Sequence, residues 1–160
     1  MTLVIDASVA VKWLVKERGS EEAATLLAQT TASDGGDQQI EGSEQKIAPK
    51  LLLLEVHHAL AKKFNEQQVT LEVLKSAPTL IKENLVMEDM DDDLMQDALN
   101  LASTTVARTD NGRPELRYGG NDCCYVALAK RRKAQLVTAD TRQKELALAQ
   151  NIVCRFIAEI

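Results

Sequence analysis

The amino-acid sequence predicts an α/β fold in which a mainly parallel central sheet is flanked by helices. Short aliphatic runs, LVID at residues 3–6 and LVTAD at residues 136–140, are typical of strands that are buried on both faces. Segments with apolar residues at helical spacing separate such runs along the chain. Because strands alternate with helices, we expect helical connections between strands that run parallel to one another.

Length and composition favour one domain. The chain has 160 residues, of which 45% are hydrophobic, and this is enough to bury one core, so we expect a single domain over residues 1–160. The stretch TASDGGDQQIEGSEQK is polar, contains glycine and has no periodicity. It predicts a mobile loop insertion at residues 31–46.

Composition also excludes several classes of protein. No apolar run approaches the ~20 residues of a membrane span, and the first residues lack the features of a secretory signal. We therefore expect a cytoplasmic protein without a membrane partner. The three cysteines fit neither a disulfide framework nor metal-ligand spacing, and a net charge of -5 argues against nonspecific binding to nucleic acid. With two histidines in the chain, carboxylates must dominate any metal site.

In the first half of the chain, local chemistry supports each expected helix. Ser8 and Ser20 precede apolar residues at helical spacing, and their hydroxyls can cap helices over residues 9–14 and 20–27. After a short strand at residues 47–48, Pro49 suits the first turn of a helix that reaches about residue 64.

The second half of the chain continues the alternation. The helix expected at residues 91–103 begins with three aspartates, where the helix dipole favours negative charge. A loop-like segment follows at residues 106–120, and NDCCYVALAKRRK then predicts a helix over residues 121–133. The remaining expected elements are a helix at 70–83, a strand at 85–87, a strand at 134–140, a helix at 143–149 and a strand at 151–157.

Several acidic residues occupy positions that are more typical of a ligand-binding site than of a hydrophobic core. Asp6 and Asp140 each follow an aliphatic strand, and ligands of open α/β sheets bind outside the carboxyl ends of the strands. Asp122 opens a helix behind two glycines, where the dipole and the free amides favour an ionised acid. Glu55 interrupts LLLLEV on the apolar side of its helix, so it requires a partner.

Taken one at a time, these acids also have structural interpretations. Asp122 and Asp140 can simply be residues that start or cap a helix, and Asp6 can belong to a turn at the end of a strand. Glu55 can form a salt bridge with Lys12 or Lys62. The sequence alone leaves these alternatives open for each residue.

Considered together, four segments resemble the PIN domain, and in particular the VapC-type ribonuclease toxins of prokaryotes. They are, in this order, LVIDASVAVKWL, APKLLLLEVHHAL, NDCCYVALA and LVTAD, and the resemblance covers nearly the whole chain. It implies a PIN-like fold with catalytic and metal-binding acids at Asp6, Glu55, Asp122 and Asp140, supported by the hydroxyls of Ser8 and Thr138. Two departures, the long loop at 31–46 and the extended segment at 113–120, affect RNA or partner choice but remove no carboxylate.

The resemblance implies a metal-dependent endoribonuclease that uses Mg²⁺ or Mn²⁺. These hard cations prefer carboxylate oxygens and can activate water for attack on a phosphodiester. The resemblance also implies products with a 5′ phosphate. Asp6 and Asp122 are the expected principal metal ligands, while Asp140 and Glu55 complete the metal's coordination or hold the attacking water. The resemblance also implies an antitoxin partner and a homodimer.

The basic side chains that lie nearest to the acids in the sequence are expected to contact phosphates of the RNA substrate. They are Lys12, Lys16, Arg108, Arg113 and Arg117.

Two other function classes stay open at this point. A strand-end aspartate also serves haloacid dehalogenase-like phosphatases as the nucleophile, but those enzymes have a second aspartate two residues later, where this chain has Ser8. The other alternative is a PIN-fold interaction or regulatory module without catalysis, and the presence of all four acids argues against it.

Overall fold

The computed structural model describes residues 1–28 and 44–158. Its main sheet has five strands in the order β3-β2-β1-β6-β7, and all neighbouring strands pair in parallel. These strands are β1 (Thr2–Ile5), β2 (Gln45–Pro49), β3 (Val86–Glu88), β6 (Gln135–Thr138) and β7 (Cys154–Phe156). The predicted α/β fold with a mainly parallel central sheet is therefore confirmed.

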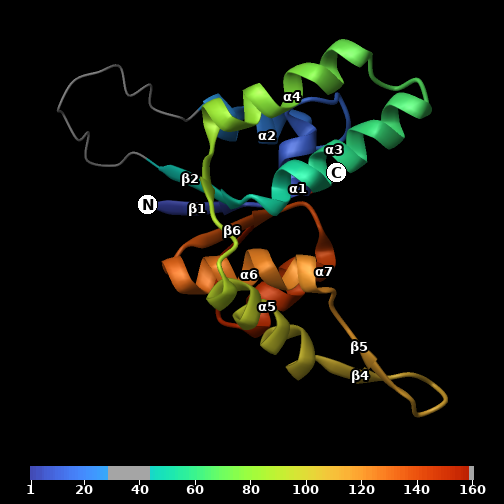
Figure 1. Ribbon diagram of the computed structural model, residues 1–160, viewed down its shortest axis with the longest axis vertical. Helices are drawn as coiled ribbons and strands as arrows, with labels where there is room; N and C mark the ends of the chain where they lie inside the picture. The colour runs from blue at the N-terminus through green and yellow to red at the C-terminus, as the bar shows by residue number, and fades with distance from the viewer. Residues whose placement is uncertain (29–43, 159–160) are drawn as a thin grey trace.

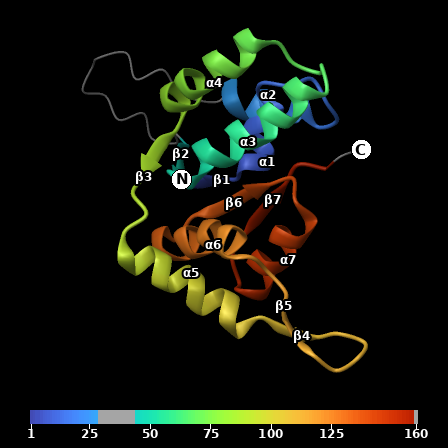
Figure 2. The same ribbon diagram turned by 45° about the vertical axis from the view of Figure 1, so that its right-hand side comes forward.

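Helices cover both faces of this sheet. They are α1 (Ala7–Lys12), α2 (Ser20–Ala28), α3 (Leu51–Asn65), α4 (Leu71–Asn84), α5 (Asp92–Thr104), α6 (Gly120–Arg132) and α7 (Thr141–Ala149). Helices α1 to α4 gather on one side of the sheet and α5 to α7 on the other, as Figures 1 and 2 show. None of the helices in the described residues is long and apolar enough to cross a bilayer.

The centre of the core consists of the two middle strands and one helix. Leu3, Val4 and Ile5 of β1 are fully buried, and the neighbouring β6 is equally well covered at Leu136 and Val137. Helix α6 lies against this part of the sheet and is buried over seven successive residues, Cys123 to Ala129. A helix that is apolar on all sides belongs in the interior, so α6 gives the residues at its amino end a rigid base.

Parallel pairing brings the carboxyl ends of β1 and β6 side by side. Ile5 is in register with Val137, and the Asp6 amide donates to the Val137 carbonyl at 3.0 Å. Because side chains that follow parallel strands meet at one edge of a sheet, the residues after Ile5 and after Val137 become neighbours.

Three boundaries predicted near the amino end of the chain are wrong. Asp6, rather than Ser8, caps α1, because Asp6 has extended backbone and its carboxylate accepts from the Ser8 amide. Pro49 is the last residue of β2 and not the first of a helix. Of the loop predicted at residues 31–46, Gln45 and Lys46 lie in β2, where they pair with β1, and residues 31–43 fall outside the described residues.

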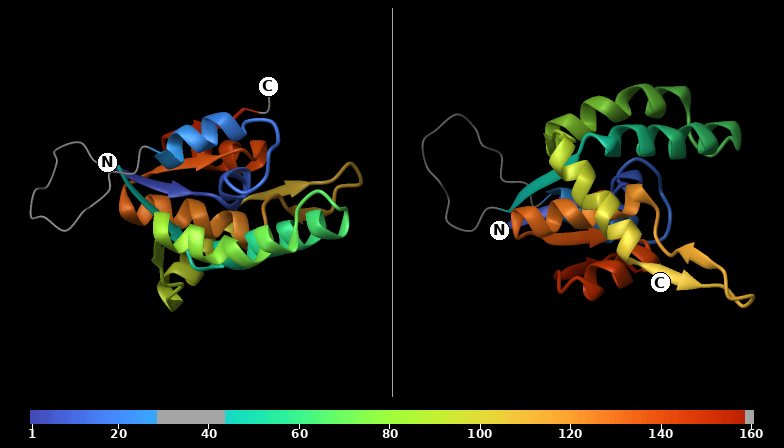
Figure 3. Two further views of the ribbon diagram at one scale, coloured as in Figure 1. Left: turned by 90° about the horizontal axis from the view of Figure 1, so that it is seen from above. Right: turned by 60° about the horizontal axis from the view of Figure 1, so that its bottom comes forward.

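The segment predicted as a loop at residues 106–120 contains a β-hairpin. Strands β4 (Val106–Arg108) and β5 (Pro114–Leu116) pair antiparallel, and Thr109 closes the turn by accepting from the Arg113 amide at 3.1 Å through its hydroxyl. The hairpin extends away from the rest of the molecule (Figure 3). Its strands are short and exposed, so they lack the apolar alternation by which a strand is detected in a sequence.

Candidate functional site

Asp6 lies at the edge of the sheet beside the end of β6. It is 5% exposed, and its Oδ2 accepts hydrogen bonds from the hydroxyls of Ser8 and Thr138, the latter at 2.9 Å. Burial raises the pKa of Asp6 above its ordinary value, and these hydrogen bonds act in the opposite direction. An ionised Asp6 is therefore held by hydroxyl donors at a position that disfavours its charge.

The same two hydroxyls connect Asp6 with Asp140. The Asp140 amide donates to Thr138 Oγ1 at 2.9 Å, and the Ala139 amide donates to Ser8 Oγ at 2.9 Å. Both residues predicted as supporting hydroxyls thus bridge the ends of β1 and β6. Their bonds fix the chain that follows β6 against the chain that follows β1.

Asp140 has the capping role that the sequence left open. Its Oδ1 accepts from the amides of Arg142 and Gln143, at 2.7 and 3.2 Å, and so begins α7. Within the described part of the chain, no partner is bonded to Asp140 Oδ2. Because one oxygen suffices for the cap, the other can serve a ligand.

Glu55 extends from α3 toward the amino end of α6, where both of its oxygens are bonded. Asn121 Nδ2 donates to Oε1 at 3.0 Å, and the Tyr125 hydroxyl donates to Oε2. Burial raises the pKa of Glu55, and the charges of Asp6 and Asp122 add to this effect. The partner that Glu55 requires is therefore supplied by an amide and a hydroxyl.

The salt bridge considered between Glu55 and Lys12 is replaced by another. The Lys12 ammonium lies 3.1 Å from Glu17 Oε1 and 2.8 Å from the Arg18 carbonyl. Lys12 is also buried, so the structure gives no support to the expectation that it contacts RNA phosphate.

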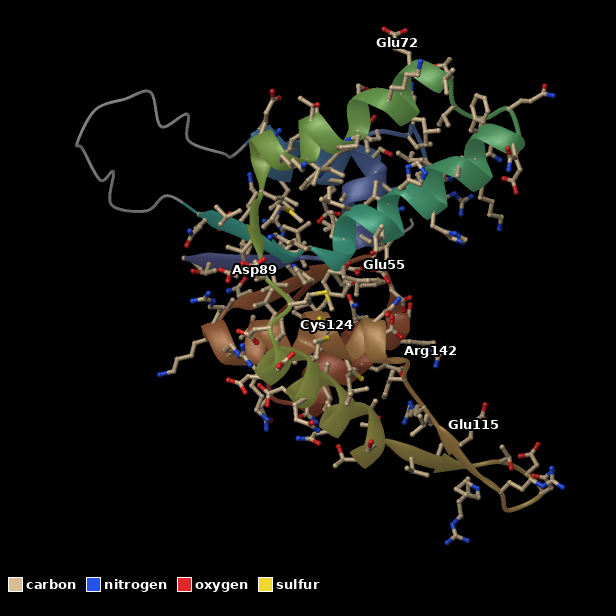
Figure 4. All side chains as sticks on the ribbon, viewed as in Figure 1. Glu55, Glu72, Asp89, Glu115, Cys124 and Arg142 are labelled. Atoms are coloured by element: carbon tan, nitrogen blue, oxygen red, sulfur yellow. The ribbon has the colours of Figure 1, made fainter. Side chains whose placement is uncertain are left out.

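Asp122 occupies the first turn of α6, as predicted, behind the extended N-cap residue Gly119. Burial raises the pKa of Asp122, the charge of Asp140 raises it further, and the charge of Arg142 acts in the opposite direction. Since Glu55 interacts with Asp6 and Asp122, and Asp122 with Asp140, the four acids form one electrostatic cluster. Figure 4 shows Glu55 between the two helical layers, on the same side of the molecule as Arg142.

The donor chemistry of this cluster suits a hard divalent cation, because it offers carboxylate and hydroxyl oxygens. In the structure, the oxygens of Asp6 and Glu55 accept hydrogen bonds from neighbouring hydroxyl and amide groups. Within residues 1–28 and 44–158, no group of three or more His, Cys, Asp or Glu side chains is already arranged to hold a metal ion.

An open cavity of about 300 Å³ adjoins the cluster. It is lined by Ser8, Val11, Lys12, Glu17, Ala59, Ala139 and Asp140. Asp140 stands at the edge of this cavity and is exposed, so a ligand from solution can reach the acids from this side.

Sequence reasoning missed several residues that touch the acids. Tyr125 lies one helical turn after Asp122, and its position three residues later was the available signal. Gln143 is 1% exposed and its side chain donates toward Asp6, while its Oε1 has no partner among the described residues. A polar side chain three residues after a strand-end acid was the corresponding signal for Gln143.

Comparison with curated proteins gives no significant match. Among solved structures, the fold is similar to that of VapC20 from Mycobacterium tuberculosis, a sarcin-ricin loop cleaving toxin, with a TM-score of 0.62, 14% identity, and coverage of 89% of this chain and 93% of that chain.

Two further solved structures have a similar fold. VapBC2 from Rickettsia felis, bound to a DNA fragment from its promoter, has a TM-score of 0.62, 16% identity and 98% coverage of both chains. A toxin–antitoxin complex from Klebsiella pneumoniae has a TM-score of 0.59, 13% identity and 99% coverage of both chains. At these identities the likeness establishes the fold. A family model described as PIN domain matches residues 3–148, which is most of the chain, and this protein therefore belongs to the PIN domain family.

Proposed function

We propose that this protein is a metal-dependent endoribonuclease and the toxin of a toxin–antitoxin pair. Membership of the PIN domain family and the fold shared with VapC20, a toxin that cleaves the sarcin-ricin loop, support this reaction class. The observation that carries the proposal is the cluster of four acids at one edge of the sheet, where Ser8 and Thr138 join the ends of β1 and β6. When they are ionised, the carboxylates of such a cluster repel one another and attract a cation.

In this proposal Asp6, Asp122, Asp140 and Glu55 hold Mg²⁺ or Mn²⁺. A bound ion supplies charge neutralisation at the phosphate, a lower pKa for its water and stabilisation of the leaving oxygen. Asp6 and Asp122 are the principal ligands. The free Oδ2 of Asp140 and the clamped carboxylate of Glu55 are available for a further bond to the ion or to water.

The reaction requires a group that accepts a proton from the attacking water. Glu55 suits this role, because its raised pKa makes it a stronger base than an ordinary carboxylate. The water oxygen bonds to phosphorus in line with the 3′ oxygen, the bond from phosphorus to that oxygen breaks, and the new fragment keeps a 5′ phosphate. Ser8 and Thr138 act on this step by fixing the orientation of Asp6.

The proposed partners are an antitoxin and a second copy of the chain. Structures with the same fold include toxin–antitoxin complexes from Rickettsia felis and Klebsiella pneumoniae. An antitoxin segment that covers the acid cluster would block RNA, which gives the pair its regulation.

Cleavage of RNA by the wild type and by Asp122→Asn tests the proposed function. We expect metal-dependent cleavage by the wild type, none in EDTA, and a rate at least ~100-fold lower for Asp122→Asn, because asparagine is a poor ligand for a hard cation. Asp97→Asn is the matched control, since Asp97 lies on α5 and pairs with Arg131. Equal rates for the wild type and Asp122→Asn would contradict the assignment. An inert wild type free of antitoxin would favour the interaction module.

Removal of the Tyr125 hydroxyl tests how Glu55 is positioned. Burial raises the pKa of Tyr125, so its hydroxyl stays protonated and donates to Glu55. In Tyr125→Phe the ring still fills the core, and we expect about 10-fold weaker Mn²⁺ binding by calorimetry and about 10-fold slower cleavage. Ser103→Ala, which deletes an exposed hydroxyl on α5, is the control. Unchanged Mn²⁺ affinity in Tyr125→Phe would show that Glu55 needs no such clamp.

A further inference from the structure

Two arginines meet on one tyrosine where the hairpin joins the acid cluster. Arg117 follows β5, and Arg142 lies in the first turn of α7. Their guanidinium carbons lie 5.4 and 5.9 Å from the centre of the Tyr118 ring, and Tyr118 itself is 4% exposed. Cations at such distances are attracted to the ring, so Tyr118 fixes both of them.

Arg142 is held by hydrogen bonds and forms no ion pair within the described residues. Its Nη2 donates to the Arg117 carbonyl, and its own amide donates to Asp140. Of the ion pairs found in the described residues, none involves Arg142, although Arg117 pairs with Glu145 at 2.9 Å. A guanidinium has five N–H donors, so most of those on Arg142 remain for a ligand from solution.

The position of this cation matters because the neighbouring site is acidic. Arg142 is close enough to act on Asp122. Burial and the charge of Asp140 raise the pKa of Asp122, and the charge of Arg142 lowers it. Figure 4 shows Arg142 and Glu55 on the same side of the molecule, and the whole chain has a net charge of -5. A polyanionic strand approaching four carboxylates is repelled unless fixed positive charge lies beside them.

We propose that Arg142, with Arg117 as a second contact, binds a backbone phosphate of the RNA strand next to the one that is cleaved. This inference rests on the proposed function and adds a substrate contact that the acids do not provide. Guanidinium matches phosphate with two parallel hydrogen bonds. Because the arginines themselves lie over the Tyr118 ring, it is the strand's backbone and not a stacked base that this site recognises.

The dependence of RNA binding on salt provides the test. Anisotropy of a labelled single-stranded RNA is measured in EDTA, which prevents cleavage, from about 50 to about 200 mM KCl. We expect Arg142→Gln to bind about 10-fold more weakly and to lower the slope of log affinity against log salt by about 0.7, the value for one lost phosphate contact on a single strand. Arg142→Lys is expected to keep the wild-type slope. Its affinity should lie about halfway, on a logarithmic scale, between those of the wild type and Arg142→Gln.

Arg132→Gln is the matched control, since it also removes one positive charge. Arg132 lies at the carboxyl end of α6, at the opposite end of that helix from Asp122, and pairs with Glu88. We expect it to bind RNA as the wild type does. If the wild type binds RNA but Arg142→Gln has the same affinity and slope, the inference is overturned while the proposed function stands. Slower cleavage by Arg142→Gln with unchanged binding also overturns it, because Arg142 would then act through Asp122. A wild type that neither binds nor cleaves RNA refutes both.

Discussion

Asp6→Asn loses at least ~100-fold of the RNA cleavage rate while keeping the melting temperature of the wild type. Asparagine has the shape of aspartate and still offers an oxygen to the hydroxyls of Ser8 and Thr138. The charge that it removes is disfavoured by burial, as the raised pKa of Asp6 indicates, so the apo protein does not depend on that charge for stability. Cleavage assays with Mn²⁺ and thermal melts without it measure the two effects separately.

Asp6→Ala behaves differently, because alanine also removes the acceptor. The cap of α1 is lost, and the buried Thr138 hydroxyl loses the carboxylate to which it donates, which destabilises the fold by roughly 1–3 kcal/mol. Wild-type cleavage by Asp6→Asn would remove Asp6 from the set of metal ligands. Equal melting temperatures for Asp6→Ala and Asp6→Asn would show that the bonds to Asp6 contribute nothing to stability.

The stability gained from Mn²⁺ is expected to be much larger at about pH 8 than at about pH 5. The folded-state pKa values of Asp6, Glu55 and Asp122 lie above their ordinary values of 3.8, 4.5 and 3.8. Above these ordinary values the folded chain therefore holds protons that the unfolded chain has released. The stability from these groups is complete below the ordinary values and is lost as pH rises through the raised ones.

A cation reverses this loss, since it binds the ionised carboxylates. The measurement is the difference in melting temperature with and without Mn²⁺ at each pH. The contributions of groups that do not bind the ion cancel in this difference. Glu17 is one such group, because its pKa is lowered and its stabilising effect declines instead as pH falls. Asp122→Asn is expected to lose most of the Mn²⁺ effect. A Mn²⁺ effect that was the same at both pH values would contradict the link between the raised pKa values and metal binding.

The sequence was sufficient to predict the sheet and the location of the acids for a simple reason. LVID and LVTAD are short aliphatic runs that only a strand buried on both faces accommodates well, and parallel pairing then places Asp6 and Asp140 at one edge. The metal-binding and catalytic roles of the acids stay predictions. The places of Asp6 and Asp140 could be predicted because each acid directly follows an aliphatic run within one short segment.

The partners of Glu55 could not be predicted in the same way. Asn121 and Tyr125 lie 66 and 70 residues away from it, and only the packing of α6 near α3 brings them together. The spacing of Tyr125 from Asp122 places both on one side of α6, but it does not tell whether the tyrosine holds an acid or only fills the core. The hydrogen bond from Tyr125 to Glu55 depends on how α6 and α3 pack, and the periodicity of a single segment does not predict that packing.

The hairpin and the first cap illustrate a different limit. Strands β4 and β5 have three residues each, too few for alternation to be recognised. At the first helix, Asp6 and Ser8 can both cap, and the choice depends on which backbone is extended. Single-sequence patterns leave such choices between neighbouring residues undecided.

The bridge from Thr138 to Asp6 joins residues that are 132 positions apart in the chain. During translation, β1 emerges early, yet β6 and Asp140 leave the ribosome only after most of the chain has been made. A nascent chain therefore carries Asp6 before the strand that orients it, and Glu55 before the helix α6 that orients it. It follows that the hydrogen bonds around Asp6 cannot form before β6 has left the ribosome, whatever part of the sheet has paired by then.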